Sequence, residues 1–165
     1  MAAVKSPADW SETVSQLSFG FSVPTEPLHS PGGEVAPRRG LLIRDPYISD
    51  ILEGRKRWEL RGFATRIRGP LGLIKSTSGR VFGECVLREC IGPLDLDILL
   101  HSSEIGPHDL LELQRAGELP YRNPEGGSST YAWVFDDVRV YPEPISYRHP
   151  SGAVTFVDLA RAVNR

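Results

Sequence analysis

From Gly40 onward, closely spaced glycine and proline residues divide the chain into short apolar segments. Val81–Arg88 alternates between two sets of side chains, as a strand with two different faces does. Gly69-Pro70 and Ser76–Arg80 are typical turn sequences. The expected strands are Leu41–Ile43, Trp58–Arg61, Leu71–Lys75, Val81–Arg88, Tyr131–Val140 and Val154–Leu159, the last two joined through Pro142, Pro144 and Pro150. This pattern predicts an α+β fold, in which a closed or half-closed small β-barrel carries helices at its ends.

Two segments are predicted to be helical. Asp45-Pro46 offers a capping carboxylate and a proline for a first turn, so a helix is expected from there to about Glu53, where Gly54 ends it as a left-handed cap. The residues expected on its buried side are Ile48, Ile51 and Leu52. An acidic stretch further along is helical in character, with Asp109–Ala116 its clearest helix and Gly117 its end.

The 165 residues fit one domain, which can bury a core without disulfides or a metal. Residues 1–39 are rich in Pro, Ser, Gly and Ala, a composition that favours a flexible N-terminal leader. Residues 1–14 are expected to be the most mobile part of it, because they offer little apolar surface to bury. We expect the ordered domain over residues 40–160 and a C-terminal tail over residues 161–165.

The sequence favours an intracellular protein. No apolar run approaches the roughly 20 residues of a membrane helix, and the N-terminal residues lack the apolar core of a secretory signal. Cys85 and Cys90 have no metal-ligand spacing and are expected to be reduced thiols, which would face opposite ways on a continuous strand. We therefore expect a cytoplasmic monomer, or a nuclear one if the source is a eukaryote.

The charges are unevenly distributed along the chain. The net charge of −2 argues against attraction to duplex nucleic acid by bulk charge. Gly54–Arg68 holds six basic residues and one carboxylate, a net +5, whereas Leu94–Glu118 holds six carboxylates and one arginine, a net −5. Taken alone, each run is interpreted as a solvated face.

Several motifs of catalysis are absent from the sequence. There is no phosphate-binding GxxxxGK[ST] loop, no GxGxxG after a strand and no GxSxG elbow. The four histidines lie far apart without the HExxH spacing of a zinc site. We therefore expect neither a metal nor another cofactor.

The segment Gly54–Arg61 concentrates groups of chemical interest. Trp58 and Leu60 share one face of a strand, so Glu59 and Arg61 share the other, with Lys56 at the bend before it. An amine, a carboxylate and a guanidinium this close can hold a phosphate or a polar base edge. Neighbouring cations also lower the pKa of a lysine, which would suit a base or nucleophile. The alternative is a salt-bridged strand with exposed arginines.

The same segment, Gly-Arg-Lys-Arg-Trp-Glu-Leu-Arg, matches the GxKxxExR signature of the ASCH family, the activating signal cointegrator homology domains. The chain resembles this family from about Gly40 to Leu159. The flanking segments that resemble it, in the family's order, are Asp45-Pro46-Tyr47, Gly69-Pro70-Leu71, Tyr131–Phe135 and Tyr147–Leu159.

The resemblance implies a PUA-like β-barrel with a cleft lined by Lys56, Glu59 and Arg61. Members of the family are thought to bind RNA or other nucleic acid, and some are associated with hydrolysis of RNA or of modified nucleosides. The small members that deacylate acetylated cytidine carry Thr where this chain has Glu59, so the candidate nucleophile of that reaction is missing here.

The first functional hypothesis is a module that binds single-stranded RNA or a nucleotide. Its expected binding residues are Tyr47, Arg55, Lys56, Glu59 and Arg61. Tyr47 is the better candidate for stacking on a base, because Trp58 shares its face with Leu60 and is expected in the core.

Two alternatives remain. The first is a hydrolase, either a ribonuclease or a modified-nucleoside amidohydrolase. In it, Lys56 would serve as base or charge stabiliser, Glu59 as acid/base partner and Arg61 as oxyanion or phosphate clamp. The second is a protein-interaction domain, whose acidic residues 94–118 would dock a basic partner.

Overall fold

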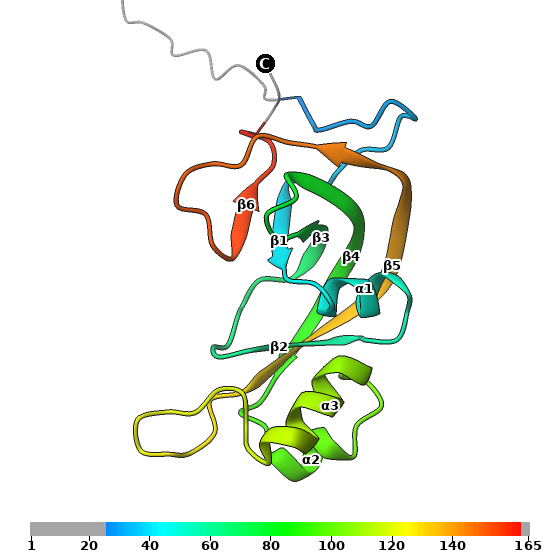
Figure 1. The fold of residues 1–165 in the computed structure, drawn as a ribbon. Coiled ribbons are helices and arrows are strands. Elements are labelled where there is room, and N and C mark those ends of the chain that lie inside the picture. The colour runs from blue at the N-terminus through cyan, green and yellow to red at the C-terminus, as the bar shows by residue number, and fades with distance from the viewer. Residues whose placement is uncertain (1–25, 163–165) are drawn as a thin grey trace, which may run out of the picture.

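The computed structural model describes residues 26–162, which form one curled sheet with three short helices (Figure 1). In chain order, the elements are β1 (Arg39–Ile43), α1 (Tyr47–Leu52), β2 (Trp58–Arg61), β3 (Gly69–Lys75), β4 (Arg80–Ile91), α2 (Leu96–Leu100), α3 (Pro107–Ala116), β5 (Tyr131–Ser146) and β6 (Phe156–Asp158). The strand order is β2-β5-β4-β3-β1-β6, with β1 and β3 parallel and the other neighbours antiparallel. The predicted α+β half-barrel is confirmed.

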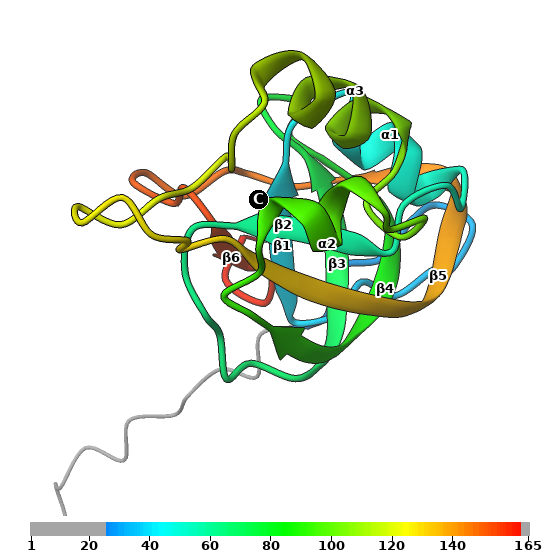
Figure 2. The ribbon, with the colours of Figure 1, turned by 90° about the horizontal axis from the view of Figure 1, so that it is seen from below.

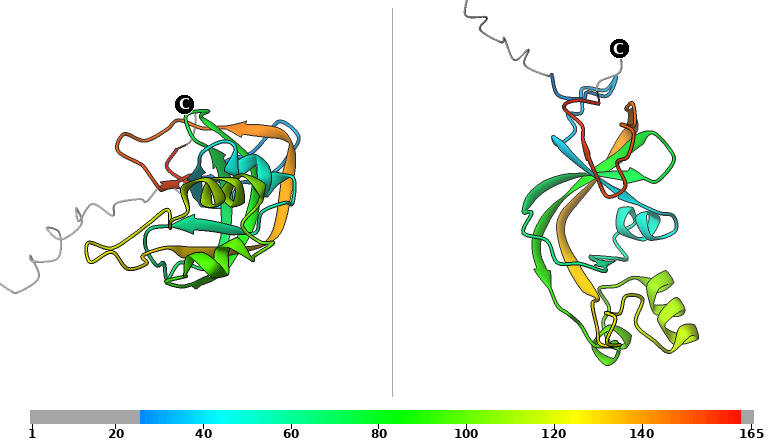
Figure 3. Two further views of the ribbon diagram at one scale, coloured as in Figure 1. Left: turned by 60° about the horizontal axis from the view of Figure 1, so that its bottom comes forward. Right: turned by 90° about the vertical axis from the view of Figure 1, so that its left-hand side faces the viewer.

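The sheet curls because its two longest strands bend. β4 and β5 pair with three interruptions of register, and such bulges bend a strand and increase its twist. The side view shows both strands as arcs around the helices (Figure 3). β5 was expected to end at Val140 but continues to Ser146, through Pro142 and Pro144. The two prolines lie in the largest interruption, where the ladder does not require a hydrogen bond from their backbone nitrogens.

A second correction concerns Gly69-Pro70, which was expected to be a turn. These residues begin β3 instead and pair with Leu87 and Val86 of β4. Proline is tolerated there because the first residues of a strand need not donate to the ladder.

The alternation of Val81–Arg88 is confirmed, since Val81, Gly83, Cys85 and Leu87 are buried. The two cysteines nevertheless pack against one apolar cluster. A register shift between Leu87 and Glu89 changes the parity of the strand, so that Cys90 returns to the side of Cys85. Both thiols are free, and burial raises the pKa of Cys85 to about 12.

α1 and α3 lie across one opening of the curled sheet (Figure 2). α1 begins at Tyr47, after Pro46, and Asp45 does not cap it: its carboxylate accepts hydrogen bonds from the Ser49 hydroxyl and from Lys75. Of the expected buried residues, Ile48 and Ile51 are buried and Leu52 is partly buried. The predicted glycine stops are confirmed, because Gly54 (φ +76°) and Gly117 (φ +67°) both adopt left-handed conformations.

The packed region extends beyond the expected boundaries at both ends. Leu28 and Ala36, within the expected leader, are buried in the same apolar cluster as Ala162, within the expected tail. Residues 1–14, expected to be mobile, lie outside the described part of the chain. Within residues 26–162, no helix has the length and apolar character to span a bilayer.

Candidate functional site

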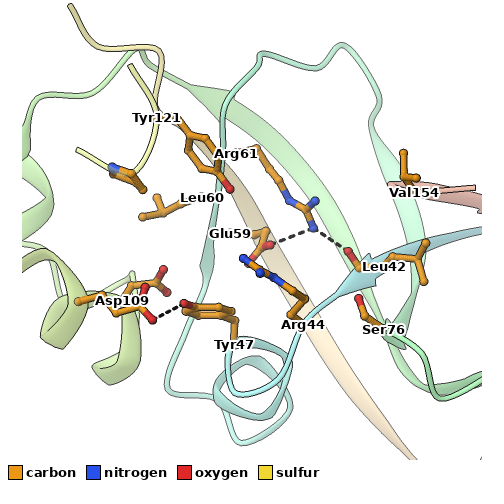
Figure 4. Close-up of a pocket in the computed structure, with 12 residues that line it drawn as sticks. Leu42, Arg44, Tyr47, Glu59, Leu60, Arg61, Ser76, Asp109, Tyr121 and Val154 are labelled. Carbon is orange, nitrogen blue, oxygen red and sulfur yellow. Dashed lines mark hydrogen bonds and ion pairs between the residues drawn. The ribbon is translucent and has the colours of Figure 1, made fainter. Parts of the chain in front are cut away.

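A cleft of about 430 Å³ lies beside β2, α1 and α3, and Figure 4 shows the residues that line it. Figure 1 shows how these three elements are arranged. Its walls come from both helices, the strand β2, the ends of β1 and β3, and two loops. The lining residues are Leu42, Arg44, Tyr47, Glu59, Leu60, Arg61, Ser76, Asp109, Glu112, Pro120, Tyr121 and Val154. The volume suits a small organic ligand.

β2 places the acidic and basic groups of the GxKxxExR segment at this cleft. Its pairing with β5 sets Glu59 opposite Trp133 and Arg61 opposite Tyr131. Glu59 is buried at the base of the cleft and Arg61 is half-buried in its wall. Leu60 is buried in the cluster beneath the helices, and Trp58 is only partly buried against it.

Lys56 lies beneath the cleft and is absent from its lining, because its side chain is only 1% exposed. Its ammonium pairs with Asp109 of α3 and with Glu59 Oε2 at 3.3 Å. It also lies 5.3 Å from the centre of the Tyr47 ring. Glu59 Oε1 in turn forms an ion pair with Arg61 Nη2 at 3.0 Å, so two cations and two carboxylates form one connected floor.

The Asp109 carboxyl is held out of water on the side of the cleft formed by α3. Burial raises its pKa to about 6, although the ammonium of Lys56 acts in the opposite direction. A carboxyl with this pKa changes charge close to neutral pH, which ordinary aspartates do not do.

Arg61 is fixed on several sides. Its Nη2 donates to the Leu42 carbonyl at 2.8 Å and forms an ion pair with Glu59, and its guanidinium lies 5.6 Å from the centre of the Trp133 ring. Its Nε is buried and has no acceptor among the described residues. This buried donor therefore remains unsatisfied within residues 26–162.

Arg44, which follows β1, is the cleft cation that sequence reasoning missed. It is exposed, and within residues 26–162 its side chain makes no hydrogen bond or ion pair. The close-up shows its side chain beside Tyr47 and Glu59, directed into the cleft (Figure 4). No motif marks Arg44 in the sequence, since only the fold brings the end of β1 to β2.

Of the other two predicted residues, Tyr47 and Arg55, only Tyr47 belongs to the cleft. Tyr47 lines the cleft and donates its hydroxyl to Glu112 Oε1 at 2.6 Å; burial and this carboxylate raise the pKa of the phenol. Arg55 is outside the cleft and donates to Glu53 and to the buried Asp50. Burial would raise the pKa of Asp50, but hydrogen bonds from Arg55 and His108 outweigh it and hold that pKa below its ordinary value.

The basic and acidic runs, interpreted separately as solvated faces, partly pair with each other. Lys56 pairs with Asp109, and Arg57 pairs with Glu104 at 3.5 Å. Charges of the two runs are therefore partly neutralised by ion pairs within the domain. Among the described residues, no group of three or more His, Cys, Asp or Glu side chains is arranged to hold a metal ion.

Comparison with known proteins gives a family match and a set of similar structures. The sequence profile of the ASCH domain matches residues 41–144. A tyrosine-to-phenylalanine mutant of the ASCH protein of Zymomonas mobilis is similar at 16% identity and a TM-score of 0.48, over 66% of this chain and 74% of that one. A serine-to-alanine mutant of the same protein gives 16% and 0.47, over 68% and 77%. The unmutated protein gives 15% and 0.42, over 66% and 72%. No curated protein matched the sequence.

Proposed function

Because the chain belongs to the ASCH domain family, we propose that its cleft binds single-stranded RNA or a nucleotide. The observation that carries this proposal is Arg44, an exposed cation that faces the cleft without an ion-pair partner among residues 26–162. Arg61 adds a fixed guanidinium whose Nε lacks an acceptor in the same part of the chain. Two guanidinium groups in one cleft suit a phosphate or the acceptor edge of a base.

Two aromatic side chains supply the surface for a base. Tyr47 and Tyr121 both line the cleft, and the close-up shows them on opposite sides of Glu59 (Figure 4). The Tyr47 ring is anchored at both its hydroxyl and its face, by Glu112 and Lys56. A ring held in this way loses little conformational freedom when a base packs against it.

The experiment is a titration of the ¹⁵N-labelled protein with the four ribonucleoside 5′-monophosphates. We expect ligand-specific shifts of amides near Arg44, Glu59 and Tyr121. Arg44→Ala should weaken binding, whereas Arg66→Ala, which removes an exposed arginine outside the cleft, should not. Absence of shifts with all four nucleotides and with single-stranded RNA would overturn the proposal.

A second candidate function, hydrolysis in the same cleft, is favoured by one observation. Asp109 lines the cleft with a pKa of about 6, which suits a general acid at near-neutral pH. Lys56, paired with two carboxylates, would then stabilise charge and act through them. Incubation with single-stranded RNA and with acetylated cytidine tests this: an enzyme would form product with the wild type and much less with Asp109→Asn.

A further inference from the structure

A second cavity continues the cleft on the side of β1 and β3. It has a volume of about 510 Å³ and lies between the Ser76–Gly79 turn and the segment that follows β5. The two cavities share three wall residues: Leu42, Ser76 and Val154. The close-up shows these three together at one end of the cleft (Figure 4). The cleft and the second cavity are therefore compartments of one groove.

The boundary between the two compartments offers a ligand one apolar group and one hydroxyl. Val154 is 82% exposed, although it is apolar and stands over the groove. The Ser76 hydroxyl makes no hydrogen bond within residues 26–162. An isopropyl group and a free hydroxyl at a crossing point suit a ribose, which presents both carbon and hydroxyl surface.

The second compartment is built around a fixed imidazole. In neutral His149, Nε2 donates to the Ala153 carbonyl at 3.0 Å, so Nδ1 accepts from the Tyr147 hydroxyl, also at 3.0 Å. Both ring nitrogens are thereby engaged within the protein. What His149 can still offer a ligand is the face of its ring, which suits stacking.

The two compartments also differ in charge. The cleft contains Glu59, Asp109 and Glu112, whereas no carboxylate of residues 26–162 lines the second compartment. Its walls are a hydroxyl-rich turn, an aromatic pair and small apolar groups. A ligand that bears a negative charge on every unit meets no like charge in this compartment, and it meets the unpaired Arg44 in the cleft beside it.

We propose that the groove binds two consecutive nucleotides of a single strand, one in the cleft and its neighbour between the Ser76–Gly79 turn and His149. The linking sugar-phosphate crosses at Ser76 and Val154. This inference rests on the proposed function and sharpens it, because a site for a free mononucleotide needs only the cleft. The substrate class is accordingly an oligonucleotide.

The test compares pA, pApA and pApApA, and the corresponding uridine series, by isothermal titration calorimetry. The second nucleotide should tighten binding by roughly 5- to 100-fold, the gain expected from one further stacked base. The third should add less than about twofold, because the groove has two compartments. Equal affinities for mono- and dinucleotides would overturn the inference.

Two variants locate the second nucleotide. His149→Ala should abolish the gain from the second nucleotide and leave mononucleotide affinity unchanged. Val154→Asp, at an exposed position where folding is insensitive, should weaken the dinucleotide more than the mononucleotide by placing a carboxylate beside the linking phosphate. A gain that survives both variants would overturn the inference. Mononucleotide binding that needs Arg44 but shows no gain with length would overturn the inference and leave the proposed function standing, whereas no binding by any nucleotide would overturn both.

Discussion

Both the floor of the cleft and its rim, formed by Arg44 at the end of β1, carry cations, but the surroundings of these cations differ. On the floor, Lys56 is 1% exposed and engaged by Asp109 and Glu59. On the rim, Arg44 is exposed and makes no ion pair among the described residues. The difference shows that a basic residue in a motif can be buried in structural ion pairs: Lys56 joins the walls of the cleft, whereas Arg44 is available to the ligand that we propose.

The energetics of the floor follow from its burial. An ammonium removed from water is tolerated only when partners compensate the lost hydration, and Lys56 has two carboxylates for this purpose. The pair with Asp109 joins the bend before β2 to α3, across 53 positions of sequence. The floor therefore fixes the distance between two walls of the cleft.

The largest effect is expected from Lys56→Ala. It leaves two carboxylates buried without their ammonium, which typically costs about 3–5 kcal/mol of unfolding free energy. Urea unfolding followed by circular dichroism measures the loss. The matched control is Lys56→Met with Asp109→Leu, which removes both charges and should recover most of the stability. A stable Lys56→Ala protein would show that the floor is not structural.

Arg44→Ala should weaken ligand binding and barely change stability, in contrast to Lys56→Ala. Removing an exposed, unpaired side chain should change the free energy of unfolding by less than about 0.5 kcal/mol. Loss of a hydrogen bond to a charged ligand should weaken binding of a nucleoside monophosphate roughly 10- to 100-fold. Calorimetric titration of the variant beside Arg66→Ala checks this. Equal weakening by both substitutions would indicate a diffuse basic surface and no defined site.

The sequence predicted the parts of this site that depend on local order. Glu59 and Arg61, two positions apart on one strand, both line the cleft as strand parity predicts, and Gly54 follows α1 in the left-handed conformation expected of a helix stop. The burial of Lys56 could not be derived, because its partner Asp109 belongs to a helix distant in sequence. Arg44 was missed for the same reason, since the pairing of β1 with β3 brings it to the cleft.

Long-range pairing also decided where the strands end. The alternation of buried residues in β4 could be predicted from the sequence. The register shifts could not, because they depend on the partner strand; they place Cys90 beside the cluster of Cys85 and let β5 continue through Pro142. A bulge changes the parity of every residue after it, so local pattern fails beyond that point.

A smaller effect is expected from pH, through Asp109 on the floor. Its pKa is raised to about 6, so its contribution to stability is fully present below its ordinary pKa of about 3.9 and is lost as pH rises through 6. Protonation also removes a negative charge from the cleft. Binding of ApA should therefore tighten at least about twofold from pH 7 to pH 5.

The choice of ApA matters because it lacks the terminal phosphate that itself titrates near pH 6. Asp109→Asn should flatten the dependence of affinity on pH. His108→Asn, which removes the neighbouring imidazole, should leave the dependence of affinity on pH unchanged. A slope that persists in Asp109→Asn would assign the pH dependence to another group.

The smallest effect is expected from Tyr47→Phe. The substitution keeps the ring in the cleft and removes an exposed hydrogen bond to Glu112. The free energy of unfolding should fall by at most about 1 kcal/mol. Nucleotide affinity should change less than about twofold, because stacking needs only the ring. A large loss of affinity would mean that the hydroxyl itself contacts the ligand.

The most direct test of the difference between floor and rim is a nitrogen-detected NMR titration of the wild-type protein with pApA. It follows the side-chain signals of Arg44 and Lys56 in one experiment. We predict that Arg44 Nε shifts and saturates with the ligand, while the Lys56 ammonium stays in its ion pairs and barely moves. A saturable shift at Lys56 with none at Arg44 would contradict the account.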